Sequence, residues 1–166
     1  WQALHPDDPA ALVLAGARGW RFDPAWTQGG GDIIETGYIA EADKWPLYAG
    51  ALGLIFPSLY EGFGFPVIEA FACGTPVICS RSASLPEVGG SVAHYVDLPP
   101  AQPNAPHTLM QAAEVAADPL PHLMDRILAE RDRADLRVQR QQQAARFTWA
   151  QAAASVLDSW RILAHN

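Results

Sequence analysis

The feature that most constrains the fold is a glycine-rich loop, residues 61–65, which lies between a short apolar run and a helical pattern. The run at 51–56 is continuously apolar and is closed by a proline, which is typical of a strand buried on both faces. After the loop, Pro66 and Gly74 are the start and stop signals of a helix, and a second apolar run follows. This order predicts one βαβ unit whose loop lies where ligands bind in open α/β sheets.

The residues of the loop indicate what it can bind. Gly62 and Gly64 lack a Cβ, so the backbone there can take positive φ and lie directly against a ligand. The loop leads to a helix N-terminus, where free N–H groups and the helix dipole favour an anion such as a diphosphate. Two carboxylates, Glu61 and Glu69, bracket this segment, and carboxylate oxygens accept hydrogen bonds from sugar hydroxyls. The sequence therefore predicts a nucleotide-sugar pocket.

A longer segment carries a family resemblance. Residues 57–70 (PSLYEGFGFPVIEA) with 74–78 (GTPVI) resemble the signature of group 1 glycosyltransferases, which are retaining enzymes of the GT-B fold. Glu61 and Glu69 match the E-x(7)-E motif of this family. The resemblance implies an α/β fold with a Rossmann-like parallel sheet and helices on both faces, the C-terminal half of a GT-B enzyme. It continues at three further sites: residues 84–88, 95–97 and 147–149.

The resemblance also implies how the chain is organised. Residues 1–146 correspond to the donor-binding domain without its first strand, and residues 147–166 to the C-terminal crossover helix. We expect a chain that is truncated at its N-terminus, although the alternative is that upstream residues exist outside this sequence. Such a fragment is expected to bind nucleotide weakly, to catalyse nothing and to self-associate through its C-terminal helix.

Roles for individual residues follow from the resemblance. Glu61 would hold the transferred sugar and stabilise positive charge at the anomeric carbon, and Glu69 would bind the ribose hydroxyls. The alternatives are a solvated loop acid for Glu61 and, for Glu69, a glutamate favoured by the helix dipole. The remaining candidates would contact the sugar, the phosphates or the base, chiefly through the backbone, and several have packing as their alternative role: Gly62, Phe63, Gly64, Phe65, Tyr38, Ile39, Ser58, Leu59 and Val67.

The predicted function is transfer of a sugar from a nucleotide-diphosphate sugar to a glycan or lipid-linked acceptor bound by the N-terminal domain. GDP-mannose and a UDP-sugar are the candidate donors. No metal or other cofactor is expected, because preorganised N–H groups can stabilise a departing diphosphate. Two alternatives stay open: a nucleotide-sugar epimerase of the same fold, and a catalytically inert nucleotide-sugar-binding or interaction domain. A phosphorylase would need a cofactor-linked lysine, and the single lysine, Lys44, lies on a predicted helix away from the loop.

Composition narrows the class of protein. The net charge of −7 argues against a nucleic-acid surface, which would need clustered Lys and Arg. No apolar run approaches the roughly 18 residues that would span a bilayer, so we expect a cytoplasmic protein with at most peripheral membrane contact. The two cysteines, Cys73 and Cys79, stand in apolar contexts and are expected to be buried thiols rather than a disulfide.

The rest of the chain predicts further strands and helices. Residues 11–15 are typical of a buried strand, and residues 41–51 of a helix whose apolar stripe includes Tyr48. Residues 122–146 predict a pair of surface helices, with the charges between Arg126 and Arg140 forming a solvated face. A last helix follows, with Thr148 as its N-cap.

Overall fold

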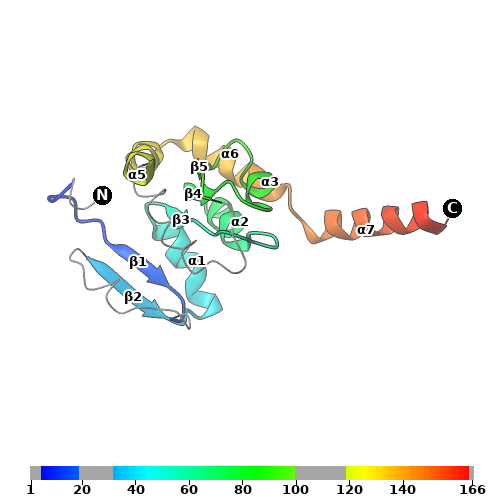
Figure 1. Ribbon diagram of the computed structural model, residues 1–166, viewed down its shortest axis with the longest axis horizontal. Coiled ribbons are helices and arrows are strands. Elements are labelled where there is room, and N and C mark those ends of the chain that lie inside the picture. Colours follow the sequence, from blue (N-terminus) through cyan, green and yellow to red (C-terminus); the bar gives the residue numbers. More distant parts are fainter. Residues whose placement is uncertain (1–4, 19–31, 100–118, 165–166) are drawn as a thin grey trace. The chain divides into compact units, whose positions relative to one another are not determined.

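The structure is a computed structural model that describes residues 5–18, 32–99 and 119–164 (Figure 1). The chain divides into two compact units, Trp1–Leu47 and Tyr48–Asn166. Both sheets consist of parallel strands, and helices pack on the sheet of the second unit, which confirms the predicted α/β class.

The first unit holds a two-stranded parallel sheet. Strand β1 (Leu12–Ala15) pairs with β2 (Ile33–Gly37) in a register that sets Leu12 opposite Ile33. The side chains of Leu12 and Val13 are 43% and 39% exposed. The prediction that this strand is buried is therefore wrong for the structure, since two strands cannot cover both of their own faces. Helix α1 (Glu41–Gly50) follows and continues into the second unit.

The second unit contains the predicted βαβ arrangement. Three parallel strands lie in the order β3-β4-β5, and their bounds are Leu54–Phe56, Val77–Ser80 and His94–Val96. Helix α2 (Phe65–Ala72) connects β3 to β4, and α3 (Leu85–Gly89) connects β4 to β5. The loop of residues 61–64 therefore follows the carboxyl end of β3, as the sequence predicts.

The core of this unit forms between α2, α3, α6 and one face of the sheet. The contiguous cluster consists of buried apolar residues: Val67, Ala70, Phe71, Val77, Cys79, Leu85, Val88, Ala93 and Ala144. Ile78 is fully buried but lies outside this cluster, as expected for a side chain that points to the opposite face of the strand. Helix α5 (Pro119–Glu130) contacts β4 and β5, and its Ile127 is 4% exposed, so helices cover both faces.

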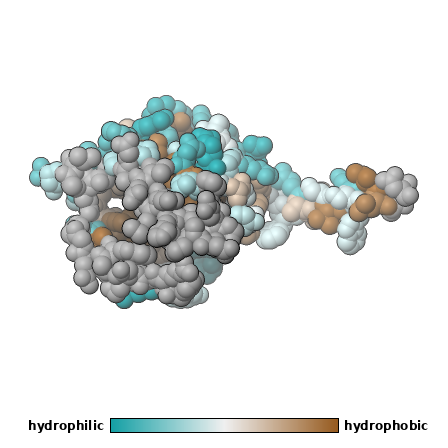
Figure 2. Space-filling view, viewed as in Figure 1, coloured by the Kyte–Doolittle hydropathy of each residue, from teal (hydrophilic) through white to brown (hydrophobic). Residues whose placement is uncertain are grey.

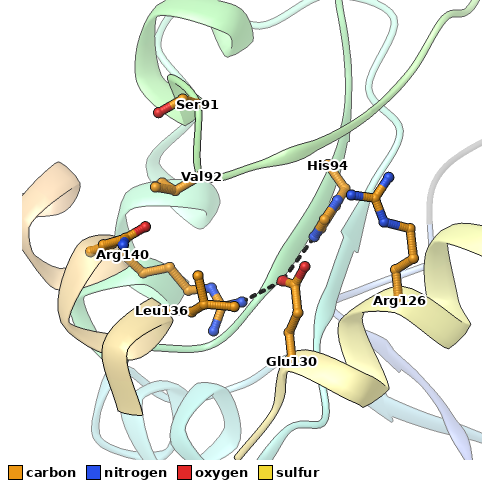
Figure 3. A pocket seen from close by; sticks show the side chains of 8 residues that line it. Ser91, Val92, His94, Arg126, Glu130, Leu136 and Arg140 are labelled. Atoms are coloured by element: carbon orange, nitrogen blue, oxygen red, sulfur yellow. Dashed lines mark hydrogen bonds and ion pairs between the residues drawn. The ribbon is translucent and has the colours of Figure 1, made fainter. Parts of the chain in front are cut away.

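A charged cluster joins α5, α6 (Ala134–Ala145) and β5. Glu130 accepts hydrogen bonds from the guanidinium of Arg140 at 2.8 Å and, within 3.0 Å, pairs with Nε2 of His94 (Figure 3). The prediction of a solvated face is wrong for Arg140, which is 1% exposed. A guanidinium this buried loses its hydration, and the carboxylate of Glu130 offsets that cost. Burial lowers the pKa of Arg140, and Glu130 opposes that shift.

The last helix, α7 (Trp149–Ala164), begins with a capping box. The Thr148 hydroxyl accepts the N–H of Gln151 at 3.2 Å, and the Gln151 side chain accepts the Thr148 N–H at 3.1 Å, which confirms Thr148 as the N-cap. Figure 2 shows apolar side chains on the surface of this helix, and those more than half exposed are Trp149, Val156, Leu157, Trp160, Ile162 and Leu163. None of the helices in the described ranges has the length and apolarity needed to cross a membrane.

Candidate functional site

Two serine hydroxyls order the segment after β3, one within the segment and one from the sheet. Ser58 Oγ donates to the Tyr60 carbonyl at 3.0 Å, and the Ser80 hydroxyl, which is fully buried on β4, donates to the Ser58 carbonyl. The side chain of Ser58 is therefore used within the chain, and Leu59 beside it is half-buried. These bonds fix the point from which the glycine loop begins.

A third serine holds the glycine loop itself. The hydroxyl of Ser84, at the N-cap of α3, lies 3.1 Å from the Glu61 carbonyl oxygen and 2.9 Å from the Phe63 carbonyl oxygen. Its one proton is shared between these two acceptors. Because Ser84 satisfies carbonyls of the loop, it orients this backbone without using any of the loop's N–H groups.

The two glycines of the loop differ. Gly64 is the N-cap of α2 with φ of 100°, and a Cβ there would lie 2.7 Å from Leu85 Cδ2. Gly62 has no positive φ, and a Cβ there would meet nothing within 4 Å. The expected conformational role of glycine thus holds for Gly64 and is wrong for Gly62. A requirement for glycine at Gly62 would have to come from a ligand that approaches the backbone.

The N-terminus of α2 presents unused hydrogen-bond donors. In the described part of the chain, the N–H groups of Gly62, Phe63, Gly64 and Phe65 have no acceptor. The N-cap supplies no side-chain acceptor either. The Val67 N–H donates to the Gly64 carbonyl at 3.0 Å, and the Val67 side chain is fully buried. A run of free N–H groups at the positive end of a helix can bind an anion.

The two glutamates lie in different surroundings. Glu69 is on α2, half-buried, and its Oε2 accepts a hydrogen bond from the Tyr48 hydroxyl at 3.1 Å. Glu61 is half-buried on the loop, and its carboxylate makes no hydrogen bond or ion pair with any residue that the structure describes. One acid is thus held by the protein, whereas the other is available to a ligand.

The aromatic rings of the loop pack against the protein. The Phe63 ring centroid lies 4.9 Å from that of Phe65 and 5.8 Å from that of Phe147, which precedes α7. These contacts favour the packing alternative for Phe63, whereas the Phe65 ring, which contacts Phe63, is 52% exposed. The proposed contacts of Phe63 and Phe65 with a donor therefore rest on their backbone N–H groups.

Two predicted residues belong to the first unit. Tyr38 and Ile39 follow β2, and Tyr38 is 85% exposed while Ile39 is half-buried. All other candidates belong to the second unit. Contact of Tyr38 and Ile39 with the donor base stays a prediction.

Sequence reasoning missed the polar side chains that position the site. The sequence predicts Tyr48 as part of an apolar stripe and assigns no role to Ser84 or to Thr75, whose hydroxyl donates to the Tyr48 carbonyl at 2.7 Å. The sequence does contain a signal for the role of Tyr48, because a tyrosine in an apolar stripe carries a hydroxyl that needs a hydrogen-bond partner.

Among the described residues, no group of three or more His, Cys, Asp or Glu is placed to hold a metal ion. Cys73 and Cys79 are free thiols, as predicted, and the prediction of burial is confirmed for Cys79 but is wrong for Cys73, which is half-buried.

Comparison with known proteins decides the family. Residues 1–117 match the family described as glycosyl transferases group 1. The chain belongs to this family. It is 45% identical over 91 residues to O-antigen chain mannosyltransferase B of Escherichia coli, an alignment that covers 52% of this chain and 24% of the relative. It is 31% identical over 151 residues to a GDP-mannose-dependent alpha-(1-6)-phosphatidylinositol dimannoside mannosyltransferase of Mycobacterium tuberculosis, covering 89% of this chain and 35% of the relative.

A solved structure supports the same assignment. Sucrose-phosphate synthase from Thermosynechococcus elongatus superposes with a TM-score of 0.55 and 27% sequence identity, over 97% of this chain and 40% of that one. The group 1 glycosyltransferase resemblance and the GT-B type of α/β fold are thereby confirmed. The chain spans well under half the length of each of these proteins.

Proposed function

We propose that this group 1 glycosyltransferase chain is the donor-binding part of a retaining mannosyltransferase that uses GDP-mannose. The observation that carries the proposal is the row of free N–H groups at the start of α2, with Glu61 and Glu69 on either side. The choice of donor is supported by the relatives, since two of them are mannosyltransferases and one is named as GDP-mannose-dependent. Residues 1–146 would form the donor domain and residues 147–166 the crossover helix.

Each part of the donor has a chemically matched group on the chain. The diphosphate would lie on the N–H groups at the start of α2, where the helix dipole favours its negative charge. The ribose hydroxyls would donate to the Glu69 carboxylate. The mannose hydroxyls would donate to Glu61, whose negative charge also stabilises the oxocarbenium-like anomeric carbon. Tyr38 and Ile39 would contact the guanine base.

The reaction follows from this placement. The bond between the anomeric carbon and the diphosphate oxygen breaks, and a bond to the acceptor hydroxyl oxygen forms on the same face of the sugar. The acceptor proton passes to the departing diphosphate. The N–H groups supply fixed positive ends of dipoles where charge develops on that diphosphate, so the proposed step needs no metal. The acceptor would be a glycan or lipid-linked glycan bound by an N-terminal domain.

Calorimetric titration of the complete protein with GDP-mannose, GDP and UDP-glucose tests the donor assignment. We expect both guanine ligands to bind at least tenfold more tightly than UDP-glucose. Glu69→Ala should weaken GDP binding about tenfold or more, because a charged acceptor for the ribose is lost. Asp158→Ala is the matched control, since it removes one negative charge from an exposed position on α7. Equal affinity of the parent and Glu69→Ala for every nucleotide would overturn the ribose assignment.

A product assay separates the proposed reaction from the alternatives. An α-configured mannoside on a glycan acceptor, made from the α-linked donor, is the expected product. A changed sugar that remains on its nucleotide would instead indicate an epimerase. Nucleotide binding without turnover by the complete protein would indicate an inert binding domain.

A further inference from the structure

The last turn of helix α1 carries a tyrosine, Tyr48, that reaches the site. The hydroxyl of Tyr48 donates to Oε2 of Glu69 across 3.1 Å, between two half-buried side chains from different helices. The ring of Tyr48 also packs against the apolar core that α2 forms with the sheet. Glu69 is therefore held from the side by a group whose own position depends on the core.

The backbone of Tyr48 is fixed as well. Thr75 Oγ1 donates to the Tyr48 carbonyl at 2.7 Å, and the Ala51 N–H approaches the same oxygen at 3.2 Å. Thr75 is 4% exposed and lies three residues after the last residue of α2, and its N–H donates to the Ala70 carbonyl of that helix at 2.9 Å. Tyr48 is thus bonded both to Glu69 on α2 and to Thr75 just after α2, so it is tied to the helix whose N-terminus forms the proposed diphosphate site.

We propose that Tyr48 is a positioning residue that holds the Glu69 carboxylate for the ribose hydroxyls of the donor nucleotide. A free glutamate side chain has three rotatable bonds, and ordering them when a ligand binds costs affinity. A bond from Tyr48 to Oε2 selects one orientation beforehand and still leaves acceptor capacity on the carboxylate. This inference rests on the proposed function, because it assigns Tyr48 to the same nucleotide site.

The substitution Tyr48→Phe removes the hydroxyl and keeps the ring that packs on the core. We expect it to weaken GDP binding about three- to tenfold, which is the effect of one hydrogen bond to a positioned acceptor. For 2′,3′-dideoxy-GDP, which lacks the ribose hydroxyls, we expect a change of less than about twofold, because the orientation of Glu69 then no longer matters. Titration calorimetry on the complete protein measures all four affinities.

Two further variants make the result specific. Tyr95→Phe is the matched control, since the Tyr95 hydroxyl also donates to a partner, the Gly90 carbonyl at 2.8 Å, but lies away from the Glu69 side chain. It should leave GDP affinity unchanged. In a Glu69→Ala background, Tyr48→Phe should have no further effect on GDP binding, because the group that it positions is absent.

The outcomes separate this inference from the function on which it rests. A parent that binds GDP but loses no affinity on Tyr48→Phe contradicts the positioning role alone. Equal losses for GDP and dideoxy-GDP contradict it too, since they would indicate a general structural effect. A parent that binds no nucleotide at all contradicts the proposed function and this inference together.

Discussion

The two ends of helix α2 are built in opposite ways. At the C-terminal end, Gly74 has a φ of 80° and its N–H donates to the Phe71 carbonyl at 2.8 Å, while the Thr75 N–H donates to the Ala70 carbonyl at 2.9 Å. These two bonds form a Schellman motif, in which a left-handed glycine closes the helix. At the N-terminal end, the donors have no partner in the described residues.

Side chains of helix α6 pair with further carbonyls at the C-terminal end of α2. The side chain of Gln141 donates to the Ala72 carbonyl at 3.4 Å, and that of Arg140 approaches the Gly74 carbonyl at 3.5 Å. At the N-terminal end Ser84 instead satisfies loop carbonyls and leaves the N–H groups open. The comparison teaches that the backbone groups at the C-terminal end of α2 are paired within the protein, whereas, among the described residues, the N–H groups at its N-terminal end are not. The open end is the one that the proposal assigns to the donor.

The largest effect should come from the closed end. Replacing Arg140 by Ala removes the buried guanidinium, leaves Glu130 without its main partner and opens a cavity. We expect the free energy of unfolding to fall by about 3 kcal/mol, as measured by urea denaturation. The control is Arg133→Ala, which breaks an exposed pair with Asp135 and should change nothing measurable. Equal stability of the Arg140→Ala variant and the parent would break the comparison at this end.

At the open end of α2, substitution of Gly64 should lower the stability of the protein. Gly64→Ala places a Cβ against Leu85 at a residue with φ of 100°, so we expect a loss of about 1–3 kcal/mol in unfolding free energy. The thermal midpoint and urea titration measure this loss. A Gly64→Ala protein as stable as the parent would mean that the loop adopts another conformation in solution.

Alkaline pH should destabilise the second unit, through Cys79 on β4 and Tyr95 on β5. Burial raises the pKa of Cys79 to about 12, and burial also raises the pKa of Tyr95 to about 12. In the unfolded chain these groups lose their protons first, near their ordinary pKa values of about 8.5 and 10. The free energy of unfolding should therefore fall as pH rises from about 9 towards 12, by up to about 1.4 kcal/mol per pH unit for the buried Cys79 thiol and by less for Tyr95, which is only half-buried.

Denaturation at several pH values checks this dependence. The Cys79→Ala variant should show a shallower slope than the parent above pH 9, because one of the two groups is missing. Parallel slopes for the two proteins would show that the Cys79 thiol is accessible to water, contrary to its complete burial in the structure.

A smaller effect is expected where Ser84 holds the loop. Ser84→Ala leaves the carbonyls of Glu61 and Phe63 without this donor and should cost about 1 kcal/mol of unfolding free energy. It should also weaken GDP binding, because the N–H groups of the loop would no longer be preoriented. Ser82→Ala is the matched control, since the Ser82 hydroxyl has no partner among the described residues. Identical behaviour of the two variants would contradict the role of Ser84.

The smallest effect on stability belongs to Gly62. A Cβ there meets nothing within 4 Å, so Gly62→Ala should change the unfolding free energy by less than about 0.5 kcal/mol. It should nevertheless weaken binding of GDP-mannose, if the sugar approaches this backbone as proposed. Calorimetry and urea titration on one preparation separate the two effects. Unchanged binding would place the sugar elsewhere.

The fold of the second unit could be predicted from local signals. Pro66 and Gly74 mark α2 because their effects on the backbone do not depend on distant residues. The glycine at Gly64, the E-x(7)-E spacing and the N-cap at Thr148 are local in the same sense. These elements were accordingly predicted to within a few residues.

What the sequence did not reveal depends on contacts between distant residues. Arg140 stands in a charged segment that is typical of a solvated face, but its guanidinium reaches Gly74, far away in the chain. Tyr48 fits an apolar stripe, although its hydroxyl bonds Glu69 on another helix. Periodicity reports which side of a helix is apolar, and it does not report which polar atom lies opposite.

The most direct test of the account is a titration of the isotopically labelled protein with GDP, followed through its backbone amide NMR signals. The account predicts that the N–H signals of the open end, from Gly62 to Phe65, shift most, while those of Gly74 and Thr75 at the closed end stay nearly unchanged. Binding of GDP that shifts the closed end of α2 and leaves the signals of the glycine loop in place would contradict it.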